Sequence, residues 1–275
     1  MKNPNNFKVI RNDGRVYDLA EFGVIVNSFV PESPNPVHKR EMIDGVDGFV
    51  DLGTNYDGRI IRSVITIISV DNNDYPLLRN EMFRLFDSRE SFYIISDEEP
   101  GKRYKVKYNS PFSLSRLFST GQFNIEFISP STYAESIGTT QDEFNFENEL
   151  WQIGQGLIES DDLIYTHSST VFRIYNAGDK TVDPRELPLV IEYKGTSTNL
   201  EINNTTTGDI WSYTGSSIVE DVIKLDGVRS TKNDQSIFGA TNRKLIRLAP
   251  GWNDFTLNGT GEGFEIKFDF RFYYL

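Results

Sequence analysis

The chain has 275 residues, 38% hydrophobic and 13% aromatic, which is enough for one large domain or two ordinary domains with packed cores. It contains no cysteine, which excludes disulfides, thiolate zinc sites and cysteine nucleophiles. This suits a protein made in a reducing cytoplasm, or one that must ignore the redox state. There is no run of about 18 apolar residues, and the polar N-terminus lacks the apolar core of a signal peptide. We therefore expect no membrane span.

The formal net charge of −12 is unevenly distributed. Residues 1–133 carry 16 basic and 18 acidic side chains, whereas residues 134–275 carry 12 and 22. Residues 134–162 contain eight acids and no Lys or Arg. A broad basic surface for nucleic acid is not indicated, and we interpret the acidic stretch as a solvated linker.

The first segments indicate short strands at residues 7–11, 16–19 and 24–30, separated by turn residues. Prolines at positions 31, 34 and 36 then exclude a regular central strand. We expect the chain to be extended and exposed here, leaving the body of its domain.

Residues 43–67 begin with an Asp- and Gly-rich stretch that could be a calcium loop or the tip of a long hairpin. Starting an EF-hand loop at Asp44 or Asp47 puts apolar or Gly residues where oxygen ligands are needed, so we predict no metal site. The Asp-Gly pairs ending at Gly45, Gly48 and Gly58 instead offer the positive φ of tight turns. The return strand, residues 62–70, is apolar on both faces, so both should be covered.

Residues 74–86 combine several helix signals. Asp74 can cap the helix, Pro76 is tolerated in its first turn, and an apolar stripe follows for core packing: Leu78, Met82, Leu85 and Phe86. Strands are predicted at residues 92–95, 104–108, 112–117 and 123–127. A domain boundary is expected near residue 132.

The second half shows no convincing helix. Strand candidates at short, regular spacing predict an antiparallel sandwich: residues 171–176, 189–193, 200–203, 210–213, 218–221, 245–248 and 255–257. In the last segment, alternate residues from Phe264 to Tyr274 should be buried, with those from Glu265 to Tyr273 on the wet face.

The sequence contains no clear motif for catalysis or phosphate binding. His38 and His167 are the two histidines; neither accompanies a nucleophile elbow, and no phosphate-binding glycine loop is present. Nothing selects one catalytic pair among the 40 carboxylates. Trp211 and Tyr213 are a candidate sugar-stacking platform, although large aromatics more often fill the core. We expect no enzyme activity, cofactor or metal.

Three stretches resemble one known family. They are "DGVDGFVDLGTNYDGRIIRSVITI" after the proline-broken extension, the helix "YPLLRNEMFRLFD", and "IWSYTG…DVIKLDG…RKLIRLAPGWNDFTLNG…FEIKFDFRFYYL". In this order they span nearly the whole chain, and the sequence resembles a distal tail protein of long, non-contractile-tailed phages that infect Gram-positive bacteria.

The resemblance implies a fold with three parts. Residues 1–132 would be a β-sandwich with one α-helix and a protruding β-hairpin arm at about residues 30–59. Residues 133–150 would be an acidic linker, and residues 151–275 a galectin-like β-sandwich. Six copies would form a ring hub, each arm lying on the neighbouring copy.

The resemblance also implies partners and a location. The ring, at the distal end of the virion tail, would join the major tail tube protein to a tail-associated lysin or fibre protein, and in some relatives to receptor-binding proteins; DNA would only pass through. The predicted interface comprises Asp51, Tyr56 and Arg59 of the arm, with Ile65 and Ile67 of the two-faced strand. The alternative function is a carbohydrate-binding module for cell-wall sugars, although no H-x-N-x-R string of a galectin-type site is present.

Overall fold

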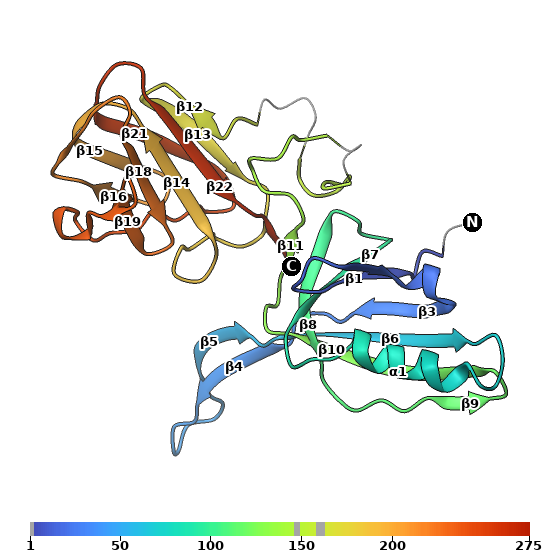
Figure 1. The fold of residues 1–275 in the computed structure, drawn as a ribbon. Coiled ribbons are helices and arrows are strands. Elements are labelled where there is room, and N and C mark those ends of the chain that lie inside the picture. Colours follow the sequence, from blue (N-terminus) through green and yellow to red (C-terminus); the bar gives the residue numbers. More distant parts are fainter. Residues whose placement is uncertain (1–2, 146–148, 158–162) are drawn as a thin grey trace. The chain divides into compact units, whose positions relative to one another are not determined.

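The computed structural model describes residues 3–145, 149–157 and 163–275 (Figure 1). The chain divides into two compact units: unit 1 is Met1–Ala134 with Leu275, and unit 2 is Glu135–Tyr274. Both are built mainly of antiparallel strands, and one α-helix lies within the described ranges. The predicted mainly β fold class is confirmed. No helix within these ranges is long and apolar enough to cross a membrane.

Seven strands of unit 1 follow one path, in the order β2-β1-β7-β8-β10-β6-β3. A short strand, β9 (Ser115–Leu117), pairs with the start of β10, so the strand predicted at 112–117 is only half as long as expected. The bounds of the seven are β1 (Phe7–Ile10), β2 (Val16–Asp18), β3 (Val24–Pro31), β6 (Arg59–Ile68), β7 (Phe92–Ser96), β8 (Lys102–Tyr108) and β10 (Thr120–Ser129).

The sheet of unit 1 curls over a single core. The ring of Phe7 on β1 lies 5.1 Å from that of Phe29 on β3 and 6.0 Å from that of Phe127 on β10. All three side chains are buried. Strands that are far apart in the strand order therefore face each other, as the two layers of a β-sandwich do.

β6 ends earlier than its apolar pattern predicts. The Ser69 backbone N–H donates to the Ser119 carbonyl at 2.9 Å, and the Ser69 hydroxyl donates to the Asp71 carbonyl at 2.8 Å. These bonds turn the chain after Ile68, and Val70 is left 94% exposed outside the strand.

A short 3₁₀ helix, η1 (Leu19–Phe22), lies early in the chain. The predicted α-helix forms as α1 (Tyr75–Leu85). Its apolar stripe is buried in the core as expected: Leu78, Met82, Leu85 and Phe86. Asp74 occupies the N-cap position but makes no side-chain cap bond, because its carboxylate accepts from the Val70 N–H at 3.2 Å. The Asp71 carboxylate instead accepts from the Asn73 and Asp74 N–H groups.

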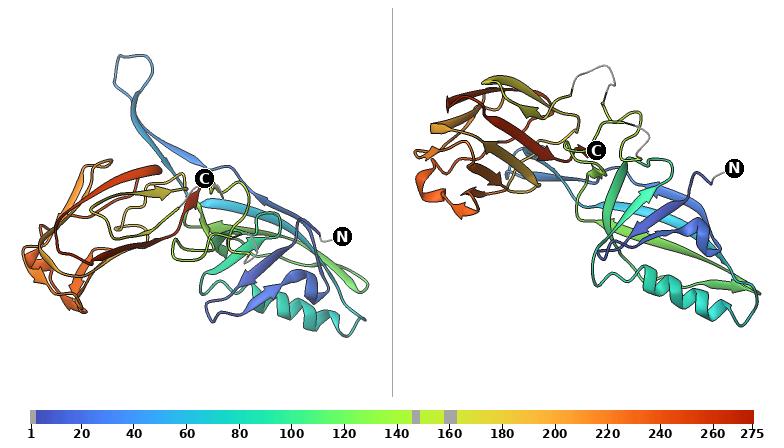
Figure 2. Two further views of the ribbon diagram at one scale, coloured as in Figure 1. Left: turned by 90° about the horizontal axis from the view of Figure 1, so that it is seen from above. Right: turned by 45° about the horizontal axis from the view of Figure 1, so that its top comes forward.

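Two further strands of unit 1 form a sheet of their own, β4 (Pro36–Glu41) paired antiparallel with β5 (Val50–Tyr56). This hairpin extends out of the body of unit 1 (Figures 1 and 2). The Asp- and Gly-rich segment is therefore the tip of a protruding hairpin, as predicted, but the return strand of that hairpin is β5. The strand predicted at residues 62–70 is instead β6, in the sheet of the body.

Unit 2 consists of two antiparallel sheets, in the orders β12-β22-β14-β18-β19-β20 and β13-β21-β15-β16, with β17 paired to β15. Phe268 on β22 packs against Phe172 on β13 at 5.9 Å and Phe255 on β21 at 4.9 Å, which makes the unit a β-sandwich. The bounds are β12 (Thr166–His167), β13 (Val171–Asn176), β14 (Leu189–Lys194), β15 (Ser197–Asn204), β16 (Asp209–Ser212), β17 (Ser216–Ser217), β18 (Val222–Asp226), β19 (Arg229–Lys232), β20 (Gln235–Ser236), η2 (Phe238–Ala240), β21 (Gly251–Thr260) and β22 (Glu265–Phe270).

Two predicted strands of unit 2 are wrong. Residues 218–221 form a turn, because Asp221 accepts from the Ile218 N–H and donates its own N–H to the Ile218 carbonyl, both at 3.0 Å. Residues 245–248 pair at a single bridge, Val182 with Leu248. In both cases local or side-chain hydrogen bonds replace a strand ladder.

The C-terminal segment carries the predicted buried stripe along and beside β22 and β23 (Tyr273–Tyr274): Phe264, Ile266, Phe268, Phe270, Phe272 and Tyr274. Tyr273, predicted on the wet face, is also buried at 4% exposure. The loop at Gly178 packs on it so closely that an added Cβ would lie 2.6 Å from the Tyr273 nitrogen.

Part of the acidic segment 133–150 is packed in unit 2. The Thr140 hydroxyl donates to the Phe268 carbonyl at 2.8 Å and accepts from the Phe270 N–H at 3.1 Å. β11 (Ala134–Ser136) pairs with β23, and the Trp151 indole donates to the Glu143 carbonyl. Residues 146–148 lie outside the described residues.

Candidate functional site

The hairpin of β4 and β5, here called the arm, is unusual in its exposure. Every residue from 35 to 57 is exposed, although many of them are apolar. Monomeric proteins rarely present so many large apolar side chains on one element without a partner. The exposed apolar side chains are Val37, Met42, Ile43, Val46, Phe49, Val50, Leu52 and Tyr56.

Local hydrogen bonds and glycines shape the arm. Gly45 and Gly48 take positive φ values of 82° and 93° at the tip, as the turn prediction requires. Gly53, with φ 101°, lies where the register slips by one residue, and its N–H is held by the Asp51 carboxylate at 2.9 Å. His38 is hydrogen-bonded to the Thr54 hydroxyl at 2.8 Å across the two strands.

The root of the arm is clamped to the body of unit 1. The Glu32 N–H donates to the Ile60 carbonyl, the Asp57 N–H donates to the Asn35 carbonyl, and the Thr132 hydroxyl donates to the Asp57 carbonyl at 2.7 Å. Gly58 does not take a positive φ. An added Cβ there would lie 2.5 Å from the Ser129 carbonyl oxygen, so the glycine serves close packing.

Charged side chains also hold the root of the arm against the body of unit 1. The Arg62 guanidinium pairs with Glu32 and, at 3.0 Å, with Glu126. The hydrogen bond from Asn109, reinforced by Arg62, lowers the pKa of the Glu126 carboxyl below its ordinary value. The arm is thus held where it leaves the body.

The predicted interface residues separate into three groups. Asp51 and Tyr56 are exposed on the arm. Arg59 is engaged at the root, where Nε donates to the Glu32 carbonyl at 2.9 Å and the guanidinium lies over Tyr104. Ile65 and Ile67 are 0% exposed within their own subunit, so placing them at an interface is wrong. They point into the curled sheet, on the same side of β6 as Ile61.

Trp211 and Tyr213 are 1% and 7% exposed in the core of unit 2, so neither ring can stack on a sugar. The Trp211 indole donates to the Ser230 hydroxyl at 3.3 Å. Trp252 is the most exposed of the three tryptophans, at 37%, and its ring centroid lies 4.9 Å from that of Tyr175.

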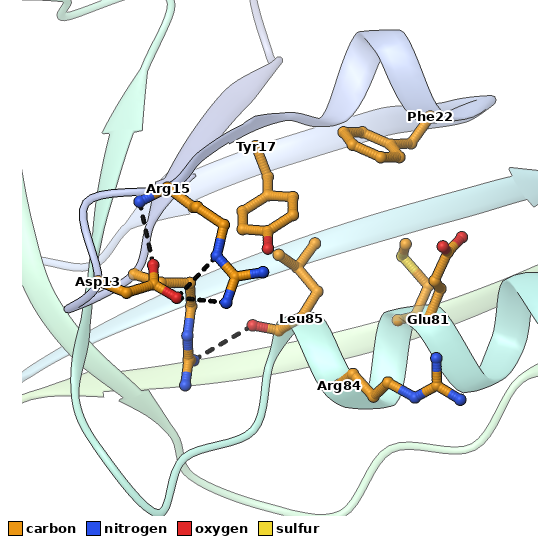
Figure 3. Close-up of a pocket in the computed structure, with 9 residues that line it drawn as sticks. Asp13, Arg15, Tyr17, Phe22, Glu81, Arg84 and Leu85 are labelled. Atoms are coloured by element: carbon orange, nitrogen blue, oxygen red, sulfur yellow. Dashed lines mark hydrogen bonds and ion pairs between the residues drawn. The ribbon is translucent and has the colours of Figure 1, made fainter.

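A groove runs along α1 in unit 1 (Figure 3). One cavity of about 460 Å³ lies between the β1–β2 turn and the helix, and a second of about 530 Å³ adjoins it and shares Phe22, Glu81 and Arg84. Arg15 hydrogen-bonds to Asp13 at 2.7 Å, which lowers the pKa of that carboxyl. This surface, called the helix groove, is assembled from distant segments, and sequence reasoning missed it.

The described residues contain no group of three or more His, Cys, Asp or Glu side chains that could hold a metal ion. His167 stacks on Phe172 with ring centroids 4.4 Å apart, and its Nε2 donates to the Ile164 carbonyl at 3.0 Å. Burial lowers the pKa of this imidazole because its charged form is desolvated.

We expect unit 2 to lose stability as the pH falls below about 6.5, the ordinary pKa of histidine. A folded-state pKa below that value means that the unfolded chain takes up the proton first, so the stabilisation is complete above pH 6.5 and declines below it. His167→Phe should retain the ring contact and remove this part of the pH dependence in urea unfolding between pH 7 and 5. His38→Phe, on the exposed arm, is the control; an unchanged slope in His167→Phe would contradict the assignment.

Residues 12–129 match the model of the phage tail protein RIFT-related domain. The match covers the N-terminal part of the chain. The matched residues contain the arm, most of its root and most of the helix groove. The predicted resemblance to a distal tail protein is confirmed by this match together with the fold described next.

The whole chain shares a fold with the SPP1 Dit (gp 19.1) protein, described as a paradigm of the hub adsorption apparatus in Gram-positive-infecting phages. The TM-score is 0.70 at 15% identity, over 97% of this chain and 99% of that chain. Chains of the phage p2 baseplate in its activated conformation, with Sr and with Ca, align at TM-scores of 0.45, with 10% and 9% identity, over 97% of both chains. No curated protein matches the sequence.

Proposed function

We propose that this phage tail protein is a structural hub: six copies form a ring at the distal end of the tail tube, and the arm of each copy docks on the next. The role requires assembly and no catalysis. The observation that carries it is the arm, because residues 35–57 are all exposed within the subunit although eight of their large side chains are apolar.

The physical argument is that an isolated two-stranded hairpin is only marginally stable in water. Docking on a neighbour would bury the apolar side chains of the arm, each contributing about 1.5–3 kcal/mol when fully buried. Because hydrogen bonds at the root already fix the direction of the arm, little of this free energy would be lost in ordering the arm. The remainder would hold the two subunits together.

The partners of the ring follow from the same proposal. The major tail tube protein would lie on one side, and a tail-associated lysin or fibre protein on the other. Unit 2 would be a galectin-like module on the outside, available to receptor-binding proteins. Assembly would take place in the bacterial host's cytoplasm before the protein enters the virion. The sugar-binding alternative lacks its stacking platform, because both aromatic rings, Trp211 and Tyr213, are buried in unit 2.

The test replaces residues 37–55 of the full-length chain by a short Gly-Ser turn. The intact chain should form a ring by light scattering and electron microscopy, whereas the variant should remain monomeric at the same concentration. Its thermal unfolding should be nearly unchanged, because the removed side chains are exposed. A ring that survives the replacement, or an intact chain that never forms one even with its tail partners, would refute the proposal.

A further inference from the structure

A cleft of about 770 Å³ in unit 2 lies between the outer face of β15 and β16 and the loop of residues 242–247. We propose that this surface, called the edge cleft, binds a neutral oligosaccharide. The inference goes beyond the proposed function, because it gives unit 2 a ligand and does not depend on a ring. It also does not use the rings of Trp211 and Tyr213, which are buried.

One wall of the edge cleft is the outer face of two paired strands. Glu201 on β15 and Ser212 on β16 are directly opposite each other in the antiparallel register. Ile210 lies on the same face as Ser212, because side chains alternate along a strand and Trp211, between them, is buried in the core. A carboxylate, a hydroxyl and an apolar side chain are therefore neighbours on this wall.

The other wall is a loop held along the edge of β16. The Asn242 N–H donates to the Ser212 carbonyl at 3.1 Å, and Asn242 Nδ2 donates to the Ile210 carbonyl at 2.8 Å. The Asn242 side-chain oxygen accepts from the Lys244 N–H at 3.1 Å. These bonds fix the loop, and they occupy the edge of β16 where a peptide strand could otherwise add to the sheet.

The charges of the edge cleft nearly cancel. Seven of its twelve lining residues are charged, four of them cationic and three anionic. Arg247 donates to both carboxylate oxygens of Asp209, at 3.0 and 2.8 Å, and Arg185 donates to Asp183 at 2.9 Å. Balanced and mutually paired charges give little advantage to a strongly anionic or cationic ligand. They favour a neutral ligand that both donates and accepts hydrogen bonds.

Sugar hydroxyls have this property, because each hydroxyl is a donor and an acceptor. Glu201 accepts one hydrogen bond, from Asn258 Nδ2 at 3.0 Å, and has no cationic partner in the part of the chain that the structure describes. Within the same ranges the Ser212 hydroxyl makes no hydrogen bond. Both groups can therefore bind ligand hydroxyls without breaking an existing bond, and Ile210, 41% exposed, can contact the C–H face of a sugar ring.

The size and lining of the edge cleft also disfavour other ligands. Sites for small molecules have volumes of roughly 300–1,000 Å³, and this cleft falls in that range. Ile210 and Leu245 are its two apolar side chains, so a lipid or another apolar ligand would desolvate the charged groups without replacing their hydrogen bonds.

Saturation-transfer difference NMR on the full-length chain tests the site. The probes are neutral trisaccharides of glucose, galactose and N-acetylglucosamine, with glycerol phosphate as the anionic probe. At least one trisaccharide should bind, with a Kd on the order of 1 mM or lower. Glu201→Gln should weaken this binding by about tenfold, because it removes a charged acceptor at nearly constant size. Glu265→Gln, an exposed carboxylate on β22 in the other sheet, is the matched control and should have no effect.

Lys244→Glu separates a neutral ligand from an anion, because it reverses an exposed charge of the edge cleft. It should change trisaccharide binding by less than about threefold. The inference is overturned if no trisaccharide binds, or if glycerol phosphate binds instead and Lys244→Glu abolishes that binding. It is also overturned if Glu201→Gln has no effect while Trp252→Ala abolishes trisaccharide binding, since the sugar then lies on the exposed Trp252 ring. Replacing the arm should leave trisaccharide binding unchanged, so this inference and the hub proposal can fail separately.

Discussion

Replacing Ile65 by aspartate is expected to unfold unit 1 and leave unit 2 native. Ile65 is 0% exposed in the core of unit 1, where a carboxylate would have no water and no cationic partner. The cost should be at least about 5 kcal/mol, comparable with the whole stability of a domain. Hydrogen exchange followed by mass spectrometry should show lost protection in unit 1 peptides and retained protection in unit 2 peptides.

Ile68→Asp is the matched control, because Ile68 lies on the same strand but is 45% exposed. It should change the free energy of unfolding by less than about 1 kcal/mol. If Ile65→Asp kept unit 1 protected and lost only ring assembly, Ile65 would belong to the interface after all. The charge change at this position is thus a test of the core and a poor test of assembly.

Asn253→Ala should be the most damaging single truncation in the turn "APGWN" of unit 2. Asn253 is 0% exposed, and its Nδ2 donates to the Ala249 and Gly251 carbonyls at 2.8 and 3.1 Å. Its Oδ1 accepts from the Ala249 N–H at 2.9 Å and from Asn204 Nδ2 at 3.1 Å. Truncation leaves several buried polar groups without partners, which should cost about 3 kcal/mol.

The measurement is urea unfolding of the full-length chain, with hydrogen exchange to show that the lost stability lies in unit 2. Asn258→Ala is the control on the same strand, since Asn258 is exposed and bonded only to the Glu201 carboxylate in the described structure. A loss in Asn253→Ala no larger than in this control would show that the turn does not depend on the side-chain network.

Local patterns in the sequence predicted elements whose two faces differ. Alternation along β10 and β22 and the apolar stripe of α1 each reflect one buried and one wetter face, and all three were correctly predicted. The Asp-Gly pairs at the arm tip also determined their turns, because positive φ is a property of the residue itself. The apolar run at residues 218–221 misled, because the Asp221 side chain accepts from the Ile218 N–H and turns the chain there.

The sequence alone determined a mainly β chain, one helix and a protruding polar-tipped hairpin. Tertiary structure decided what covers each apolar face. Ile65 and Ile67 have the same apolar character in a core or at an interface, and only the curl of the sheet over β6 puts them inside. Likewise Trp211 is buried because a second sheet packs on it, and the helix groove exists because residues about 70 positions apart meet along α1. The spacing of apolar residues shows that one face of a strand or helix is buried. It does not show which other segment packs against that face.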